Sequence, residues 1–184
     1  MNSNLKIKGE ATISVCDVSS PEALELQNKI SKASGSEYHK LVGELHSKFL
    51  KKQVTIKNLC PTIGRTVIAA RLAGTFTYTL KINYCALGTD DTAAANENTK
   101  LGAEVFRKLV SSSTYDANVA YFSTFFTATE TTGTYKEIGH FIDGTGAADS
   151  GQLFSRITGS ETAELPLTKS ATESLTIDYK VTIE

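Results

Sequence analysis

The sequence predicts a mainly β protein: an antiparallel β-sandwich of about seven strands with one buried helix and an inserted helical hairpin. The segment 119–157 is rich in threonine, tyrosine and phenylalanine, which suit a pleated, half-buried surface. Two breaks, Glu130-Thr131-Thr132-Gly133 and the glycine- and aspartate-rich stretch 143–151, divide it into three short strands, which we expect to form an up-and-down meander. The segment 174–184 alternates apolar and polar residues and predicts a terminal strand paired within the sheet.

The composition suits one globular domain spanning residues 1–184. The chain has 184 residues, of which 40% are hydrophobic and 21% charged, and its formal net charge is -1. Without a basic excess, neither nucleic acid nor an anionic membrane is an expected partner. The N-terminus lacks the apolar core of a signal peptide, and no run approaches the about 18 apolar residues of a membrane span. We therefore expect synthesis in a cytoplasm.

The first third of the chain predicts two paired strands with helices between them. The segment 5–18 alternates in part, with Gly9 at a bulge or bend, and 53–59 alternates again and should pair with it. Ser19-Ser20-Pro21-Glu22 has the residues of a helix start, and Gly35 separates this helix from a second one. Residues 19–51 are thus expected to form a helical hairpin inserted into the sandwich.

Each helix of the expected hairpin has an apolar stripe that needs a partner. The stripes could pack on each other and on the sheet, or they could face a neighbouring subunit. Under the second interpretation, Tyr38, Leu45 and Phe49 are the candidate assembly contacts. The stripes consist of Ala23, Leu26, Ile30 and Ala33 in the first helix, and of Tyr38, Leu41, Val42, Leu45 and Phe49 in the second.

The middle of the chain predicts a helix, a strand and several connections. Pro61 opens a helix over 62–73 that Gly74 ends, and its apolar character over most of its circumference predicts burial against the sheet. The segment 75–87 alternates regularly and predicts a strand. The remaining segments are 88–96, a polar loop; 101–110, a short helix or irregular crossing; 111–116, a loop; and 158–171, a loop with a short edge strand.

No motif predicts catalysis or a resident metal, and no cofactor is expected. Glu137 and His140 have an ExxH spacing, but on a strand these positions point to opposite faces. His39 and His46 lie near one helix face, with Glu44 off that face. Two carboxylate-bearing loops could hold calcium: Asp90-Asp91, and Asp143-Gly144-Thr145-Gly146 with Asp149. The segment Gly64-Arg65-Thr66 lacks the glycines and the lysine of a phosphate-binding loop. Exposed loop aromatics such as Tyr115 could bind a sugar.

Three cysteines, Cys16, Cys60 and Cys85, are far apart and odd in number, and none has the spacing of a metal ligand. We expect buried, reduced thiols, with a disulfide pair as the alternative.

Several motifs follow one another in a definite order along the chain. They are Leu5-Lys6-Ile7-Lys8-Gly9-Glu10, Asn58-Leu59, Gly64-Arg65-Thr66-Val67-Ile68-Ala69-Ala70-Arg71-Leu72-Ala73-Gly74, Ala86-Leu87-Gly88-Thr89, Thr99-Lys100-Leu101-Gly102-Ala103-Glu104-Val105-Phe106-Arg107-Lys108, Thr132-Gly133-Thr134-Tyr135-Lys136-Glu137-Ile138-Gly139-His140-Phe141, Leu153-Phe154-Ser155-Arg156 and Leu175-Thr176-Ile177-Asp178-Tyr179. This order resembles that of small virion proteins of tailed bacteriophages, a family labelled tail-fibre-like or structural. The resemblance covers about residues 5–18 and 52–184, and the hairpin at 19–51 departs from it.

The resemblance implies a non-enzymatic structural component of the virion, in the tail, neck or fibre region, assembled in the host bacterial cytoplasm. Its partners would be other virion structural proteins and copies of itself, through the hairpin and the loops at 88–98 and 143–151. A capsid decoration protein is the alternative within the same class. A receptor- or glycan-binding module that recognises a host surface glycan is the alternative from another class.

Overall fold

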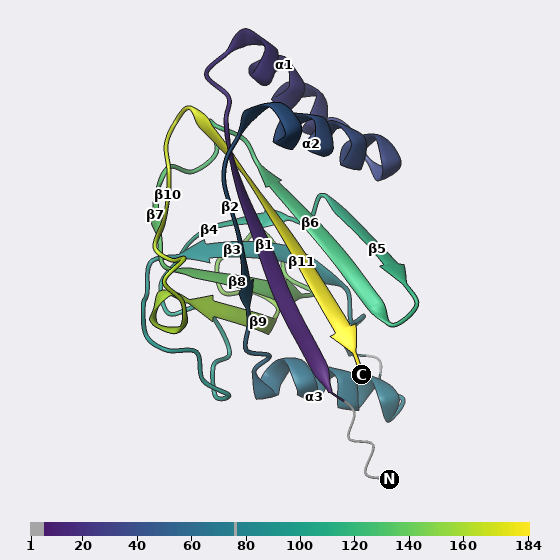
Figure 1. The fold of residues 1–184 in the computed structure, drawn as a ribbon. Coiled ribbons are helices and arrows are strands. Elements are labelled where there is room, and N and C mark those ends of the chain that lie inside the picture. The colour runs from purple at the N-terminus through teal and green to yellow at the C-terminus, as the bar shows by residue number, and fades with distance from the viewer. Residues whose placement is uncertain (1–5, 76) are drawn as a thin grey trace.

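The computed structural model describes residues 6–75 and 77–184, and it confirms a mainly β, sandwich-like fold (Figure 1). A five-stranded antiparallel sheet has the strand order β2-β1-β11-β6-β5, and a four-stranded antiparallel sheet has the order β4-β3-β8-β9. The first sheet consists of β1 (Ile7–Asp17), β2 (Leu50–Lys57), β5 (Ser112–Asp116), β6 (Val119–Phe126) and β11 (Glu173–Ile183), and the second of β3 (Ile82–Gly88), β4 (Glu104–Leu109), β8 (Glu137–Ile142) and β9 (Gln152–Thr158); β7 (Gly133–Tyr135) and β10 (Leu167–Lys169) pair separately.

The main core lies between the two sheets and comes from alternate residues of their strands. Ile13 on β1, Ile177 on β11 and Ile138 on β8 are each at most 1% exposed. The terminal strand β11 pairs with β1 on one side and β6 on the other, as its alternation predicted. The predicted pairing of the first two strands is also confirmed, since β1 and β2 are antiparallel neighbours.

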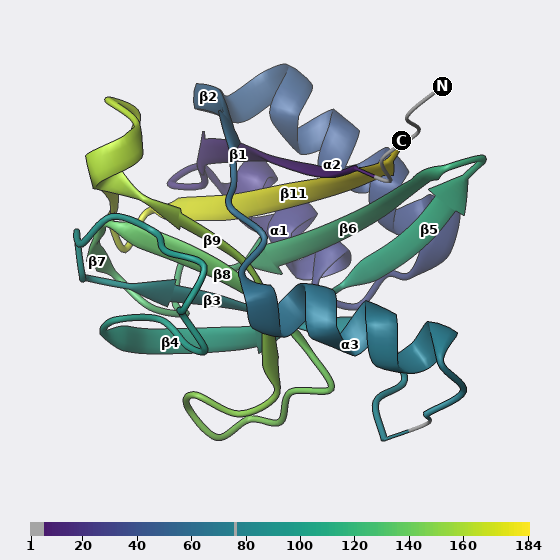
Figure 2. The same ribbon diagram turned by 90° about the horizontal axis from the view of Figure 1, so that it is seen from below.

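The expected helical hairpin is present between β1 and β2. It consists of α1 (Pro21–Ile30) and α2 (Gly35–Phe49) and covers one end of the outer face of the five-stranded sheet (Figures 1 and 2). The predicted helix start at Ser19-Ser20-Pro21-Glu22 is confirmed: Ser20 is the N-cap, and its hydroxyl accepts a hydrogen bond of 3.2 Å from the amide of Ala23. The hairpin and the sheet beneath it share a second apolar cluster, separate from the main core.

Helix α3 (Thr62–Leu72) lies across the opposite end of the sandwich (Figure 1). Gly74, with a φ of 81°, ends it as predicted, because the amide of Thr75 donates to the carbonyl of Ala70 at 2.9 Å. Only one side of α3 is buried, through Gly64 and Val67, and Leu72 is 79% exposed. The predicted packing against the sheet is therefore confirmed for one side of α3, where Gly64 lies against β9, and the other side of the helix faces solvent.

The predicted three-stranded meander is wrong in its pairing. Strands β8 and β9 are antiparallel neighbours, but β6 belongs to the other sheet, between β11 and β5. Residues 127–136, including the short β7, carry the chain from one sheet to the other. The run of β-forming residues correctly predicted three strands. It did not predict their pairing, because the connection over 127–136 is long enough for the chain to pass from one sheet to the other.

Several element boundaries also differ from the predictions. The strand predicted over 75–87 begins only at Ile82, because Leu80 has a φ of 66° and breaks the extended backbone. The segments 101–110 and 111–116, predicted as a helix or crossing and as a loop, contain β4 and β5. Leu5 and Phe76, which the predicted strands include, lie outside the described residues.

Of the bulge or bend predicted at Gly9, the bulge is absent, and this residue instead marks a close approach between segments of the chain. Its pairing with Val181 is part of a continuous register between β1 and β11. A Cβ at this position would collide with the side chain of Asn58 and lie 2.5 Å from the hydroxyl oxygen of Tyr179. A side chain at this position would therefore require the side chains of Asn58 and Tyr179 to shift.

The three cysteines are free, as predicted. Cys16 and Cys85 are buried, and Cys60 is half-buried. Burial raises the pKa of Cys16 to about 12 and that of Cys60 to about 11, so both remain thiols at neutral pH. Among the helices of the described chain, none is long and apolar enough to cross a membrane.

Candidate functional site

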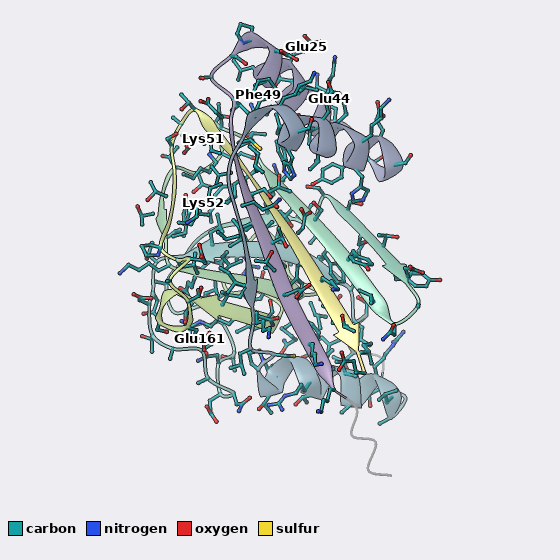
Figure 3. The ribbon with its side chains drawn as sticks, viewed as in Figure 1. Glu25, Glu44, Phe49, Lys51, Lys52 and Glu161 are labelled. Atoms are coloured by element: carbon teal, nitrogen blue, oxygen red, sulfur yellow. The ribbon has the colours of Figure 1, made fainter. Side chains whose placement is uncertain are left out.

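The stripe on α2 packs within the chain. Tyr38 is 1% exposed and Leu45 is 0% exposed, and the Tyr38 hydroxyl lies 2.8 Å from the hydroxyl of Ser123 on β6. Phe49 is half-buried at the junction of α2 and β2, above Lys51 and Lys52 (Figure 3). Packing of the stripes on each other and on the sheet is therefore confirmed. In this conformation Tyr38 and Leu45 offer no surface to a partner.

The outward side of the hairpin carries charged side chains. Lys29 pairs with Glu25 at 2.7 Å, and Lys48 contacts both Glu44 at 2.8 Å and Glu22 at 2.9 Å. Glu25 and Glu44 project from the two helices in Figure 3. Such exposed pairs add little stability, but they keep this side hydrated. The hairpin therefore presents a charged surface, with its apolar stripe facing the sheet.

The two edges of the five-stranded sheet differ in their chemistry. Edge strand β2 carries Lys51, Lys52 and Lys57, and lysines on an edge discourage pairing with another chain. Edge strand β5 has neither lysine nor proline, and Tyr115 on it is 80% exposed. Among the described residues, no strand pairs with the outer side of β5. Tyr115, predicted as a loop aromatic, therefore lies on an open edge strand.

The loops at 88–98 and 143–151 are held against the sandwich by side chains. Arg156 donates to Asp90 at 2.7 Å and to Asn98 at 2.9 Å. Arg107 donates to the carbonyls of Thr145 at 3.1 Å and Ser150 at 3.0 Å. These hydrogen bonds hold both loops, which are candidate contact surfaces, in one conformation.

The carboxylates weighed for calcium have protein partners. Asp90 accepts from Arg156, Asp143 accepts from the amide of Thr79 at 2.6 Å, and Asp149 pairs with Lys100 at 2.9 Å. In the described part of the chain, no group of three or more acidic, histidine or cysteine side chains is placed to hold a metal ion.

Glu137 and His140 lie on opposite faces of β8, as their spacing on a strand predicted. Glu137 is 0% exposed and accepts from the amides of Gly102 at 2.9 Å and Ala103 at 2.7 Å, and from Arg156. His140 points between the sheets and stacks on Tyr179, with ring centroids 4.0 Å apart. The two side chains therefore belong to separate environments.

The pair formed by His140 and Ser155 has the hydrogen-bond geometry of a general base and a nucleophile, but solvent and substrate cannot reach it. The Ser155 hydroxyl lies 2.8 Å from Nδ1 of His140, and both residues are 0% exposed. Burial lowers the pKa of His140 to about 3, so the imidazole stays neutral. A substrate cannot reach these atoms in this conformation, and the pair acts as a hydrogen bond within the core.

A groove of about 570 Å³ lies between α2 and the outer face of the five-stranded sheet. His39 and His46 line its helical wall, where their spacing of two helical turns places both on one side of α2. Asp178 lies on its floor, and burial raises the pKa of this carboxyl, while Ser123 and the two histidines act in the opposite direction. Tyr121, also on the floor, is 39% exposed.

The two histidines were recognisable from the sequence as neighbours on one helix face, but the floor of this groove was not. The alternation of 174–184 places Asp178 on the polar side of its strand, which was the available signal. That signal does not say which helix covers the strand. The groove depends on how the hairpin folds back over β6 and β11.

Comparison of the chain with models of known protein families, with curated proteins and with solved structures finds no match.

Proposed function

We propose that this protein is a non-enzymatic structural component of a tailed-phage virion that acts through contacts with copies of itself and with other virion proteins. The order of motifs over 5–18 and 52–184, which resembles that of small tail-fibre-like proteins, supports the virion setting. The open edge strand β5 is the structural observation that supports assembly. An unpaired edge exposes a row of backbone donors and acceptors, which a second chain can satisfy by adding a strand.

Strand β5 is chemically suited to pair with a second copy of itself. In an antiparallel two-fold pairing centred on Thr114, Ser112 of one copy would face Asp116 of the other, so no like charges meet. The exposed ring of Tyr115 would add apolar area at this contact. The result would be one sheet continuing through two copies.

The solution test is the oligomeric state of the purified chain by analytical ultracentrifugation over micromolar to millimolar concentrations. We expect the wild type to self-associate and Ser113→Lys, which puts a charge on the open edge, to shift the equilibrium to monomer. Thr55→Lys is the matched control, because it adds the same charge to the lysine-bearing edge β2 of the same sheet. A wild type that is monomeric throughout, or equal dissociation in both variants, would contradict assembly through β5.

The test of the virion setting is cryo-EM of the purified particle encoded together with this chain. Copies around the tail axis would support a tail, neck or fibre position. Copies repeating over the icosahedral shell would favour the capsid decoration alternative. A particle without the chain would overturn the proposal.

A further inference from the structure

The groove beneath α2 has the volume of a small-molecule site. Its volume of about 570 Å³ falls within the range of about 300–1,000 Å³ that is usual for ligand pockets. Its floor comes from three neighbouring strands, β1, β11 and β6, with Thr114 of β5 at one side. A floor of paired strands is rigid, so the polar groups on it keep fixed positions.

The polar groups in this groove suit a neutral ligand that both donates and accepts hydrogen bonds. Lys180, the basic side chain on the floor, is paired with Glu10 at 3.0 Å. Asp178 is an acceptor, and the hydroxyls of Thr12 and Thr114 can donate or accept. An anionic ligand would meet the carboxylate of Asp178, and the lysine that lines the groove is already paired with Glu10. A ligand with closely spaced hydroxyl groups would match this set.

The groove also offers apolar surface beside these polar groups. The ring of Tyr121 is partly exposed on the floor, and Val42 contributes to the helical wall. Gly43 lies between the histidine positions on the same wall, and a Cβ built there meets no atom within 4 Å. The wall is therefore open at Gly43 for lack of a side chain rather than because a neighbour excludes one.

We propose that the groove formed by α2 and the outer face of the five-stranded sheet, with Asp178 and Tyr121 on its floor, binds a short neutral glycan. Sugar rings combine hydroxyl edges, which would bond to Asp178, Thr12 and Thr114, with C–H faces, which would lie on Tyr121. This site goes beyond the assembly function. The groove is complete in a single chain, so a monomer would bind as well as an oligomer.

The test is isothermal titration calorimetry with defined neutral di- and trisaccharides of glucose, galactose, mannose and N-acetylglucosamine. Sialyllactose and spermidine serve as anionic and cationic probes. We expect saturable binding of at least one neutral oligosaccharide, stronger than that of either charged probe. Tyr121→Ala and Asp178→Asn should each weaken it at least tenfold, and Gly43→Gln should block it by filling the open part of the wall.

A matched control separates the groove from the rest of the surface. Tyr115→Ala removes an exposed tyrosine on the neighbouring strand outside the groove, and it should leave the affinity within twofold. The circular dichroism spectrum of each variant confirms that it is folded. Three results would overturn the proposal: no neutral sugar binding at millimolar concentration, binding that the groove variants leave intact, or preferential binding of spermidine.

Discussion

Arg156 is a cation buried in the protein, and its carboxylate partner is buried with it. It is 2% exposed, and its guanidinium lies 3.0 Å from Glu137 through Nε and 2.7 Å from Asp90 through Nη2. The carboxylate of Glu137 also accepts hydrogen bonds from backbone amides of the loop that precedes β4. A charge in this position is tolerable only while each partner is present.

We predict that Glu137→Gln destabilises the fold by about 3–5 kcal/mol, because it leaves the buried Arg156 charge without its buried counter-charge and puts an NH2 donor in place of an acceptor that faces other donors. Urea unfolding measures the change. Asp91→Asn is the control, since Asp91 pairs with Lys136 at 3.8 Å on the surface and should contribute about 0–1 kcal/mol. Similar losses in the two variants would refute a special role for the buried pair.

His140 makes the stability of the fold depend on pH in a definite direction. Burial lowers its pKa to about 3 in the folded chain, against about 6.5 in an unfolded chain. Between these values the unfolded state binds a proton that the folded state does not. The free energy of unfolding is therefore fully retained above about pH 6.5 and falls as the pH drops toward 3.

We predict that His140→Gln, which keeps a hydrogen-bonding group near Ser155, flattens this dependence. The difference in unfolding free energy between wild type and variant should change by up to about 1.4 kcal/mol per pH unit below pH 6.5. Urea unfolding at a series of pH values from 7 down to about 4 measures it. His46 is present in both proteins, so its contribution cancels in the difference. Parallel plots of unfolding free energy against pH for the wild type and the variant would show that His140 does not cause the pH dependence.

At the scale of elements, α2 contains two glycines in opposite conformational settings. Gly35, at its first position, has a φ of 57°, which residues with a Cβ adopt only with strain. Gly43, in its interior, has ordinary helical surroundings and open space where a Cβ would lie. The same substitution should therefore have opposite effects at the two positions.

We predict that Gly43→Ala stabilises the protein by about 0.5–1 kcal/mol, because alanine loses less backbone entropy in a helix. Gly35→Ala should destabilise it by about 1 kcal/mol or more, because it places a side chain in the left-handed region. Thermal unfolding of the pair of variants measures both effects, each serving as the control for the other. Shifts of the same sign would be inconsistent with these backbone conformations.

At the scale of the whole molecule, the sandwich and the hairpin have separate apolar cores. The cluster between the sheets contains no residue from 19–49 in the described chain. The hairpin cluster includes Phe125 and Ala128 of the sandwich, which α1 and α2 cover. Because Cys16 pairs directly with Leu50, a short turn could join β1 to β2.

We predict that a chain in which Asn-Gly replaces residues 19–49, with Phe125→Thr to remove the uncovered ring, still folds as a β-sandwich. Its unfolding midpoint should fall, because the hairpin cluster is lost. Circular dichroism and urea unfolding test this, with full-length Phe125→Thr as the control. A spectrum of disordered chain would show that the sandwich needs the hairpin to fold.

The sequence alone determined the features that depend on local periodicity and on special residues. The alternation of 5–18, 53–59 and 174–184 predicted β1, β2 and β11, and Ser20 and Gly74 marked helix ends that the structure retains. Periodicity assigns a residue to a face of its element, and glycine or a capping serine acts through bonds to its immediate neighbours. These signals need no knowledge of distant contacts.

Only the tertiary structure decided what each face meets. The β-forming segment 119–157 produced β6 in one sheet and β8 and β9 in the other. Arg156 reaches Asp90 and Glu137 across long stretches of chain, and the groove over Asp178 exists because α2 crosses the outer face of β11. Residue patterns encode which side of a strand is apolar, but partners distant in sequence are selected by packing and charge compensation in the folded chain.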